Sequence, residues 1–216
     1  MPAVLDGLKF FAQSLTNAGA VGAVWPSSKG LCEAMVRPVV ADAGRPLRVL
    51  EVGAGVGPVT TELLARLLPG DTLDVVELNE TFCATLHERF DGASPVAPTI
   101  HNADILKFEP GYRYNHIVSG LPLANFPSEL AESIYHRYFD LLEPEGTLIM
   151  FHHLVFRHAI RFLGAPKHRT RAARLLEFER ELEPLVVGES TVMFNLPPAK
   201  VTVRRRPSVG DKLVAV

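Results

Sequence analysis

The chain has few cysteines, little net charge and no long apolar run. Its 216 residues include 2 cysteines, Cys32 and Cys83, which lie far apart without metal-ligand spacing, so the sequence favours buried free thiols over a disulfide. The net charge of −2 excludes a general attraction to nucleic acid. No apolar run is long enough to span a bilayer, and the N-terminus lacks the charged-then-apolar pattern of a signal peptide. We therefore expect a cytoplasmic protein with one globular α/β domain.

Apolar runs and helix-like patterns alternate from residue 47 onward. The predicted strands are Arg48–Val52, Thr72–Glu77, 98–103, 116–120 and 146–151, and the predicted helices between them are 58–68, 80–90 and 127–142. Such alternation is typical of a parallel sheet with helices on both faces. Residues 185–194 and 200–206 are two further strand-like runs, which predict an antiparallel hairpin at the end of the sheet.

We expect three regions along the chain. Residues 1–45 form a cap that contains an amphipathic helix over residues 4–19, a glycine-rich segment and a second helix with a serine start signal. Residues 46–206 form the main α/β domain. Residues 207–216 carry little pattern and are expected to form a flexible tail.

Three alternating glycines, Gly53, Gly55 and Gly57, follow the first predicted strand. Glycine lets the backbone turn tightly and approach a ligand, and the helix that follows presents free N–H groups. Glu51 stands two residues before the first glycine. A carboxylate is unfavourable beside an anionic phosphate, but it suits a cationic or zwitterionic ligand. The common nucleoside of that kind is S-adenosylmethionine, which carries a sulfonium and an α-ammonium group.

Two more acids follow later strands. Glu77 ends the second predicted strand, the position of the acid that binds ribose hydroxyls in nucleotide-binding α/β folds. Asp104 follows the third, where its carboxylate can take an adenine amino group while Ile105 packs on the ring. Because ligands of such sheets bind at the carboxyl ends of strands, we expect Glu51, Glu77 and Asp104 to line one crevice. A helix-capping acid at Glu77 and an ordinary turn aspartate at Asp104 are the alternatives.

The order of these motifs resembles the class I S-adenosylmethionine-dependent methyltransferases over most of residues 46–206. The resemblance implies a Rossmann-like α/β fold, with a seven-stranded, mostly parallel sheet that ends in an antiparallel hairpin, to which this chain adds N-terminal helices. It also implies S-adenosylmethionine as methyl donor, S-adenosylhomocysteine as product, and no metal. The cofactor-binding residues that it implies are Glu51, Gly53, Gly55, Gly57, Glu77, Leu78, Asp104, Ile105, Ser119 and Gly120.

The loop after the fourth predicted strand, residues 119–126, lies beside the transferred methyl group in that family. Relatives that methylate bases often carry an Asn/Asp-Pro-Pro-aromatic pattern there, whose aromatic ring stacks on a flipped base. This chain has Leu123 at the aromatic position, which argues against a planar nucleobase, although Phe126 can partly substitute. A turn shaped by Gly120 and Pro122 is the alternative interpretation.

Two segments point to the substrate. Trp25-Pro26-Ser27-Ser28, with residues 119–122 and the glycine loop, resembles the bacterial phospholipid N-methyltransferases, which methylate phosphatidylethanolamine and related aminolipids. Residues 155–174 contain six Lys or Arg residues and no acid, which suits anionic headgroups; a solvated helix face is the alternative. The candidate substrate-binding residues are Trp25, Pro26, Ser27, Ser28, Leu121, Pro122, Phe126 and Arg157.

These features predict an N-methyltransferase, peripherally attached to the inner membrane, that acts on the amine of phosphatidylethanolamine or ornithine lipid. Methyl transfer is an in-line displacement that needs an unprotonated amine, and the candidates that accept its proton are Tyr135, His152 and His153. The expected partners are the aminolipid and an anionic membrane surface, without nucleic acid, and we expect a monomer. The alternatives are an RNA adenine N6-dimethyltransferase, which the same motifs also resemble, and a non-catalytic membrane-binding protein of this fold.

Overall fold

The computed structural model describes residues 28–39, 46–93, 95–153, 166–193, 195 and 197–207, and within residues 166–172 it describes the backbone only. The expected amphipathic helix over residues 4–19 and most of the expected tail lie outside this part of the chain. The boundaries of the three expected regions therefore stay predictions.

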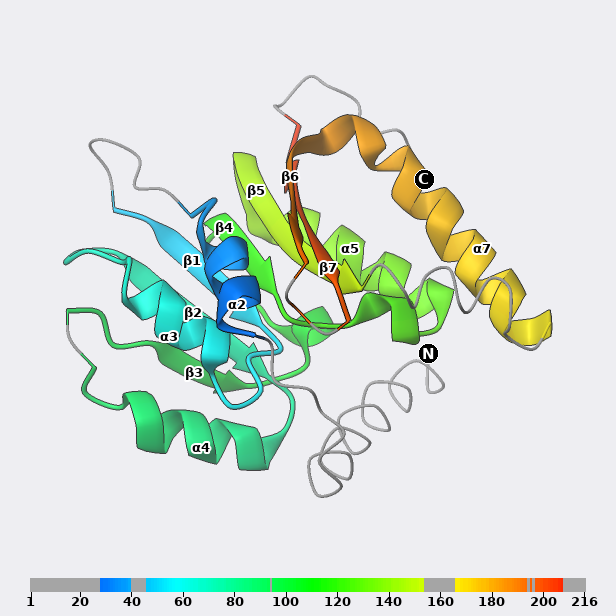
Figure 1. The fold of residues 1–216 in the computed structure, drawn as a ribbon. Helices are drawn as coiled ribbons and strands as arrows, with labels where there is room; N and C mark the ends of the chain where they lie inside the picture. Colours follow the sequence, from blue (N-terminus) through cyan, green and yellow to red (C-terminus); the bar gives the residue numbers. More distant parts are fainter. Residues whose placement is uncertain are drawn as a thin grey trace.

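A seven-stranded sheet with the order β3-β2-β1-β4-β5-β7-β6 forms the centre of the molecule (Figure 1). Its strands are β1 (Arg48–Val52), β2 (Thr72–Glu77), β3 (Thr99–Asn102), β4 (Tyr114–Ser119), β5 (Leu142–His153), β6 (Val186–Val192) and β7 (Ala199–Arg205). The first five strands are parallel, whereas β7 runs antiparallel to both β5 and β6. The predicted mostly parallel sheet with an antiparallel hairpin is confirmed.

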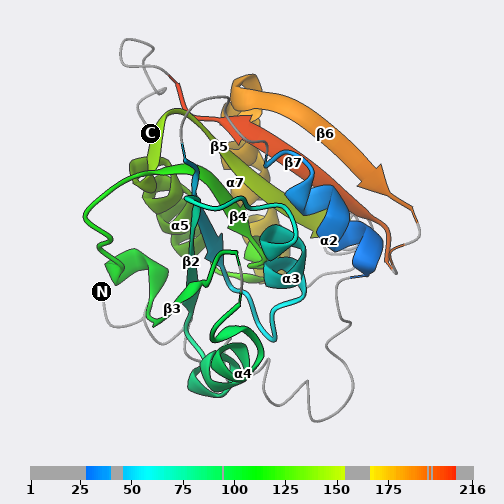
Figure 2. The same ribbon diagram turned by 90° about the vertical axis from the view of Figure 1, so that its left-hand side faces the viewer.

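Helices cover both faces of the sheet, as Figure 1 and Figure 2 show from two directions. The helices are α2 (Lys29–Val36), α3 (Pro58–Leu64), α4 (Glu80–Phe90), α5 (Ser128–Leu141) and α7 (Pro166–Glu181), with short 3-10 turns η1 (Ile105–Lys107), η2 (Leu123–Asn125) and η3 (Glu183–Leu185). One apolar cluster lies between the sheet and α5 with α7, and a second lies between the sheet and α2, α3 and α4. Successive residues of a strand point to opposite faces, so β1 contributes Val49 to the second cluster and Leu50 to the first.

Several elements begin and end where the pattern predicts. The ranges of β1, β2 and α4 are as predicted, and Ser28 caps α2, as its serine start signal indicates. Cys32 and Cys83 are buried free thiols, also as predicted. Among the described residues, no helix combines the length and the apolar character needed to cross a membrane.

The largest differences concern β5 and α7. β5 begins earlier and ends later than predicted, and its last three residues pair with β7 alone, because Ser119 pairs with Met150 at the end of β4. Helix α7 was not predicted; it begins at Pro166, a residue that suits the first turn of a helix, inside the segment interpreted only as basic.

Candidate active site

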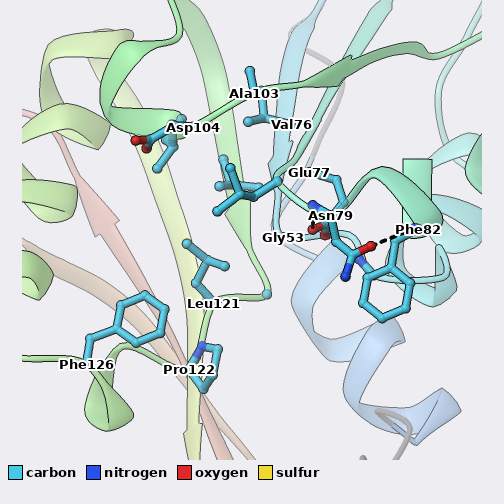
Figure 3. A pocket seen from close by; sticks show the side chains of 15 residues that line it. Gly53, Val76, Glu77, Asn79, Phe82, Ala103, Asp104, Leu121, Pro122 and Phe126 are labelled. Atoms are coloured by element: carbon cyan, nitrogen blue, oxygen red, sulfur yellow. Dashed lines mark hydrogen bonds between the residues drawn. The ribbon is translucent and has the colours of Figure 1, made fainter. Parts of the chain in front are cut away.

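A pocket opens at the carboxyl ends of β1, β2 and β4 (Figure 3). The space between its walls is about 600 Å³ when its open mouth is included. Its lining residues are Val52, Gly53, Gly55, Val76, Glu77, Leu78, Asn79, Phe82, Ala103, Asp104, Ile105, Gly120, Leu121, Pro122 and Phe126. In Figure 3 Leu121, Pro122 and Phe126 lie on one side of Gly53 and Glu77, and Asn79 and Phe82 lie on the other.

The glycine loop and the loop after β4 are in direct backbone contact. Gly53 and Gly55 have φ values of +72° and +57°, in the left-handed region that favours glycine. A Cβ on Gly120 would lie 2.6 Å from the carbonyl oxygen of Gly53, and a Cβ on Gly53 would lie 2.4 Å from Leu121 Cδ2. The absence of side chains at Gly53 and Gly120 therefore keeps the two loops together at the mouth of the pocket.

Glu77 places its carboxylate at the centre of the pocket wall. Its Oε2 accepts a hydrogen bond from the N–H of Gly55 at 2.9 Å, and its Oε1 accepts one from the N–H of Asn79 at 2.9 Å. Burial raises the pKa of this carboxyl, while the N–H groups of Asn79 and Gly55 oppose the rise. A carboxylate has roughly four acceptor positions, so further donors from a ligand can be bound.

Asp104 and Ile105 form the wall beside β3. Asp104 caps η1, and its Oδ1 accepts a hydrogen bond from the N–H of Leu106 at 3.0 Å. Ile105 is buried and lines the pocket with an aliphatic side chain. The structure thus brings Glu77 and Asp104 to one pocket, where we expected a group of acids.

Glu51 does not line this pocket, contrary to the prediction. Val52 does line it, and the alternation of side chains along β1 turns Glu51 toward α2 and α3 instead. Glu51 is 1% exposed and faces Thr60 of α3, yet its Oε2 has no hydrogen-bond partner among the described residues. Burial raises the pKa of the Glu51 carboxyl to about 8, and the nearby Glu77 carboxylate adds to the rise.

Gly57 and Ser119 support the pocket from behind and do not line it. Gly57 has a φ of +85°, precedes α3, and leaves room for the ring of Phe90, which a Cβ would approach to 2.5 Å. Ser119 is fully buried; its Oγ lies 2.8 Å from the hydroxyl of Tyr138 and accepts a hydrogen bond from the N–H of Leu121 at 3.3 Å.

The loop after β4 turns Leu123 away from the pocket. Leu123 begins η2, is 4% exposed, and belongs to the apolar cluster beneath α5. Three predicted substrate residues, Leu121, Pro122 and Phe126, line the pocket. The aromatic ring on this side of the pocket is therefore that of Phe126, three residues after the position of the stacking aromatic in relatives that methylate bases.

The structure does not bring Tyr135 to the pocket, contrary to the prediction. Tyr135 lies on the face of α5 that α7 covers. Its hydroxyl donates a hydrogen bond to Glu179 Oε1 at 3.1 Å, and its ring packs against Phe178. His152 and His153 end β5 beyond its last pair with β4, so they lie at the same edge of the sheet as the pocket. Neither histidine is among the lining residues.

The remaining substrate candidates are mostly outside the described residues. Trp25, Pro26, Ser27 and Arg157 belong to this group. Ser28 is described, and its Oγ accepts a hydrogen bond from the N–H of Leu31 at 3.2 Å as the cap of α2.

Arg174 is the member of the basic segment whose side chain is described. Its guanidinium pairs with Glu129 at 3.1 Å and with Glu132 at 3.0 Å, so it joins α7 to α5 across their exposed faces. The Arg174 guanidinium, which we expected to belong to a segment that binds anionic headgroups, is therefore already paired with two carboxylates of the protein.

Five lining residues were not predicted, namely Val52, Val76, Asn79, Phe82 and Ala103. Asn79 had a usable signal, because it follows the acid at the end of β2 and precedes a helix, which is the position of an N-cap. Its Oδ1 accepts hydrogen bonds from the N–H groups of Thr81 and Phe82 at 2.9 and 3.3 Å. The cap therefore places the first turn of α4, with the Phe82 ring, over the pocket.

The model of the ribosomal RNA adenine dimethylase family matches residues 39–202. An ornithine lipid N-methyltransferase from Singulisphaera acidiphila is 30% identical over 146 residues, which are 66% of this chain and 75% of that protein. A ribosomal RNA small subunit methyltransferase A from Dehalococcoides mccartyi is 32% identical over 117 residues. That match covers 54% of this chain but 38% of the length of the ribosomal RNA enzyme.

Solved structures with low sequence identity share the fold. A magnesium protoporphyrin IX methyltransferase from Synechocystis with bound S-adenosylmethionine has a TM-score of 0.59 at 17% identity, over 82% of this chain and 79% of that one. An N-methyltransferase from Bradyrhizobium japonicum has a TM-score of 0.57 at 16% identity, over 82% of this chain and 94% of that one.

The pKa of Glu51 predicts how its carboxyl affects stability. With a pKa of about 8 in the folded chain and 4.5 as the ordinary value, the folded state holds a proton that the unfolded state releases between these pH values. The contribution of Glu51 to the free energy of unfolding should therefore fall as pH rises from 4.5 to about 8. Glu51→Gln should remove this part of the pH dependence in urea unfolding. The exposed Glu80→Gln is the control, and equal pH dependence in the wild type and Glu51→Gln would contradict the assignment.

Gly120→Ala should destabilise the fold by about 1–3 kcal/mol, because its Cβ would meet the Gly53 carbonyl oxygen at 2.6 Å and backbone must move. Gly30→Ala is the matched control: its Cβ would have no neighbour closer than 3.8 Å, inside a helix that favours alanine. Urea unfolding measures both. A Gly120→Ala variant as stable as Gly30→Ala would show that the two loops do not need their close approach.

Proposed function

The chain belongs to the ribosomal RNA adenine dimethylase family of S-adenosylmethionine-dependent methyltransferases. Within this family, we propose that it methylates the amine of an aminolipid headgroup. The protein is an N-methyltransferase that uses S-adenosylmethionine. We propose the chemical class of the acceptor, the residues that bind it and the membrane surface at which the reaction takes place.

The pocket residues fit the cofactor. Gly55 lines the pocket with no atom within 4 Å of where its Cβ would be, so the backbone there is open to a ligand, and the Glu77 carboxylate retains acceptor capacity for ribose hydroxyls. We assign the adenine to the apolar wall at Ile105, with Asp104 as acceptor for its amino group. When bound, the cofactor supplies an electrophilic methyl group on a sulfonium, and the protein's part is to position an unprotonated amine in line with it.

The position of Leu123 is the observation that carries the choice of acceptor. Stacking on a flipped base requires an aromatic face at the site of methyl transfer, and this chain buries a leucine there, inside the cluster beneath α5. The wall that remains consists of Leu121, Pro122 and Phe126, which suits an alkylammonium better than a planar base. A cation over the Phe126 ring gains cation–π attraction, about 0.5–2 kcal/mol depending on desolvation.

The lengths of the relatives support the same choice. The chain spans 75% of the ornithine lipid N-methyltransferase but 38% of the ribosomal RNA enzyme. The lipid-modifying relative therefore matches this chain over most of its own length. The primary amine near an anionic group, as in ornithine lipid or phosphatidylethanolamine, is the acceptor chemistry that we propose.

Adenine N6-dimethylation of RNA is the second candidate. It is favoured by the family match over residues 39–202 and by the relative that is 32% identical. The net charge of −2 weighs against it, because RNA-binding domains usually carry a basic surface.

An aminolipid acceptor places the reaction at a membrane surface. We propose peripheral contact through the basic segment of residues 155–174, which would attract anionic headgroups. Within that segment, the Arg174 side chain is paired with Glu129 and Glu132. We therefore assign the contact with anionic headgroups to the basic residues that precede Arg174.

Methyl transfer to aminolipid tests the proposed function directly. Purified protein with S-adenosylmethionine should methylate phosphatidylethanolamine or ornithine lipid in vesicles that contain anionic lipid, and mass spectrometry of the product gives the headgroup and the number of methyl groups. Vesicles of phosphatidylglycerol alone, which offer no amine, are the control. Methylated adenine in ribosomal RNA, with unmodified lipid, would instead establish the second candidate.

Glu77→Gln should weaken S-adenosylmethionine binding about 10- to 100-fold, because a hydrogen bond to a charged group contributes about 1.5–3 kcal/mol. Glu80→Gln removes the same charge from the exposed first turn of α4 and should leave the affinity unchanged. Calorimetric titration measures both. Equal affinity in the two variants would contradict the assignment of the ribose to Glu77.

A further inference from the structure

A chain of hydrogen bonds joins three distant segments at the edge of the sheet where the pocket opens. The backbone N–H of Ser28 donates to Asn195 Oδ1 at 3.2 Å, across 167 positions of sequence. Asn195 Nδ2 donates to the carbonyl oxygen of Pro197 at 2.8 Å, and His153 Nδ1 lies 3.3 Å from the same oxygen. Asn195 thus links the start of α2, the connection between β6 and β7, and the end of β5.

The burial of Asn195 distinguishes it from an ordinary residue of a surface loop. Residues in connections between strands usually face solvent, whereas Asn195 is 5% exposed. Its two partners define the orientation of the amide, because the Ser28 N–H can only donate and the Pro197 carbonyl can only accept. Loss of the amide would leave both of these groups without the partner that it provides.

The Pro197 carbonyl also selects the tautomer of His153. Since a carbonyl oxygen cannot donate, the proton of a neutral ring must be on Nδ1, and Nε2 then carries the lone pair. The ring of Phe151 contacts the His153 ring edge to face, with centroids 5.4 Å apart and planes 79° apart, which restricts its rotation. The contacts with the Pro197 carbonyl and the Phe151 ring therefore fix the orientation of the His153 ring, with Nε2 as the basic nitrogen of the neutral form.

The end of β5 places His153 beyond the edge of the sheet. Ser119, the last residue of β4, pairs with Met150, and β5 continues to His153 along β7. Three residues of strand extend roughly 10 Å. The loop that lines the pocket begins at Gly120, directly after Ser119, so the end of β5 lies beside the strand end from which this loop starts.

We propose that Asn195 is a positioning residue and that His153, held as the Nδ1–H tautomer, accepts the proton of the substrate amine. The assignment of the proton acceptor depends on the proposed function, whereas the tautomer does not. The substrate ammonium gives its proton to Nε2, and the freed lone pair forms the new N–C bond. The C–S bond breaks with its electron pair remaining on sulfur, and the imidazolium returns its proton to water.

The neighbouring His152 is the natural comparison. It pairs with Lys200 of β7 in the register of the sheet, while His153 pairs with Ala199. Because successive strand residues point to opposite faces, His152 does not share the Phe151 side of β5. The charged group across from it, Lys200, is already paired with Glu189 at 2.6 Å.

The imidazole ¹⁵N chemical shifts of the full-length protein test the tautomer without any substrate. We expect the wild type to show His153 protonated at Nδ1, and Asn195→Ala to shift the signals toward a mixture with the Nε2–H form. Asn195→Asp keeps an acceptor for Ser28 and loses the donor to Pro197, so it separates the two halves of the link. A wild-type ring protonated at Nε2, or unchanged ring signals in both variants, would overturn the positioning role.

Turnover on aminolipid vesicles tests the proton acceptor. His153→Gln should lower kcat about 100-fold or more with S-adenosylmethionine affinity retained, and the matched His152→Gln should keep most of its activity. Asn195→Asp should lower kcat more than KM. Asn115→Ala is the structural control, because Asn115 is a similarly buried amide that joins Arg48 N to Glu143 at the opposite edge of the sheet, so it should cost stability but not kcat.

The outcomes separate the two levels of the proposal. Wild-type kcat in His153→Gln, with methylated lipid formed, would overturn the role of His153 and leave the proposed function standing. Unmethylated lipid with the wild-type protein would overturn the proposed function together with the proton transfer, while the ring signals decide the role of Asn195 separately.

Discussion

The contact between the backbones of Gly53 and Gly120 is the constraint on which the pocket depends. No side chain fits between them, so the ends of β1 and β4 approach as closely as two backbones can. The N–H groups of the same two glycines bond to strand carbonyls, Gly53 to Val76 and Gly120 to Val52. The carboxyl ends of β1, β2 and β4 are therefore held together as one unit. The pocket-lining residues at these strand ends, Glu77 among them, are fixed relative to one another.

Most of the fold was predictable from local patterns, because the strands and most of the helices show their periodicity within about ten residues, whereas α7 was not predicted. The placement of side chains was less so. Glu51 belongs to the right loop, yet the two-residue period of β1 turns it away from the pocket that Val52 lines. Tyr135 was misplaced because α7 covers it, and no local pattern shows which face of α5 meets another helix. The bond between Ser28 and Asn195 joins residues 167 positions apart, a distance that no motif spans.

The cofactor pocket and the acceptor side of the site have different structural origins. The pocket walls come from β1, β2, β3 and β4, elements that the whole fold shares. The acceptor side that we propose involves the loop after β4, which lines the pocket, and the end of β5, which Asn195 links to the start of α2 and the connection between β6 and β7. Family membership therefore indicates the donor of the methyl group, while our proposal for the acceptor depends on segments outside the shared strands.

The link through Asn195 has a consequence for how the protein is made. Chains emerge from the ribosome N-terminus first, at about 5–20 residues per second, and contacts between distant segments form late. Ser28 is among the early residues, but its partner is synthesised near the end of the chain. The residues that line the pocket end at Phe126, so all of them are synthesised before Asn195. The segment that completes the proposed acceptor side is thus the last part of the site to leave the ribosome.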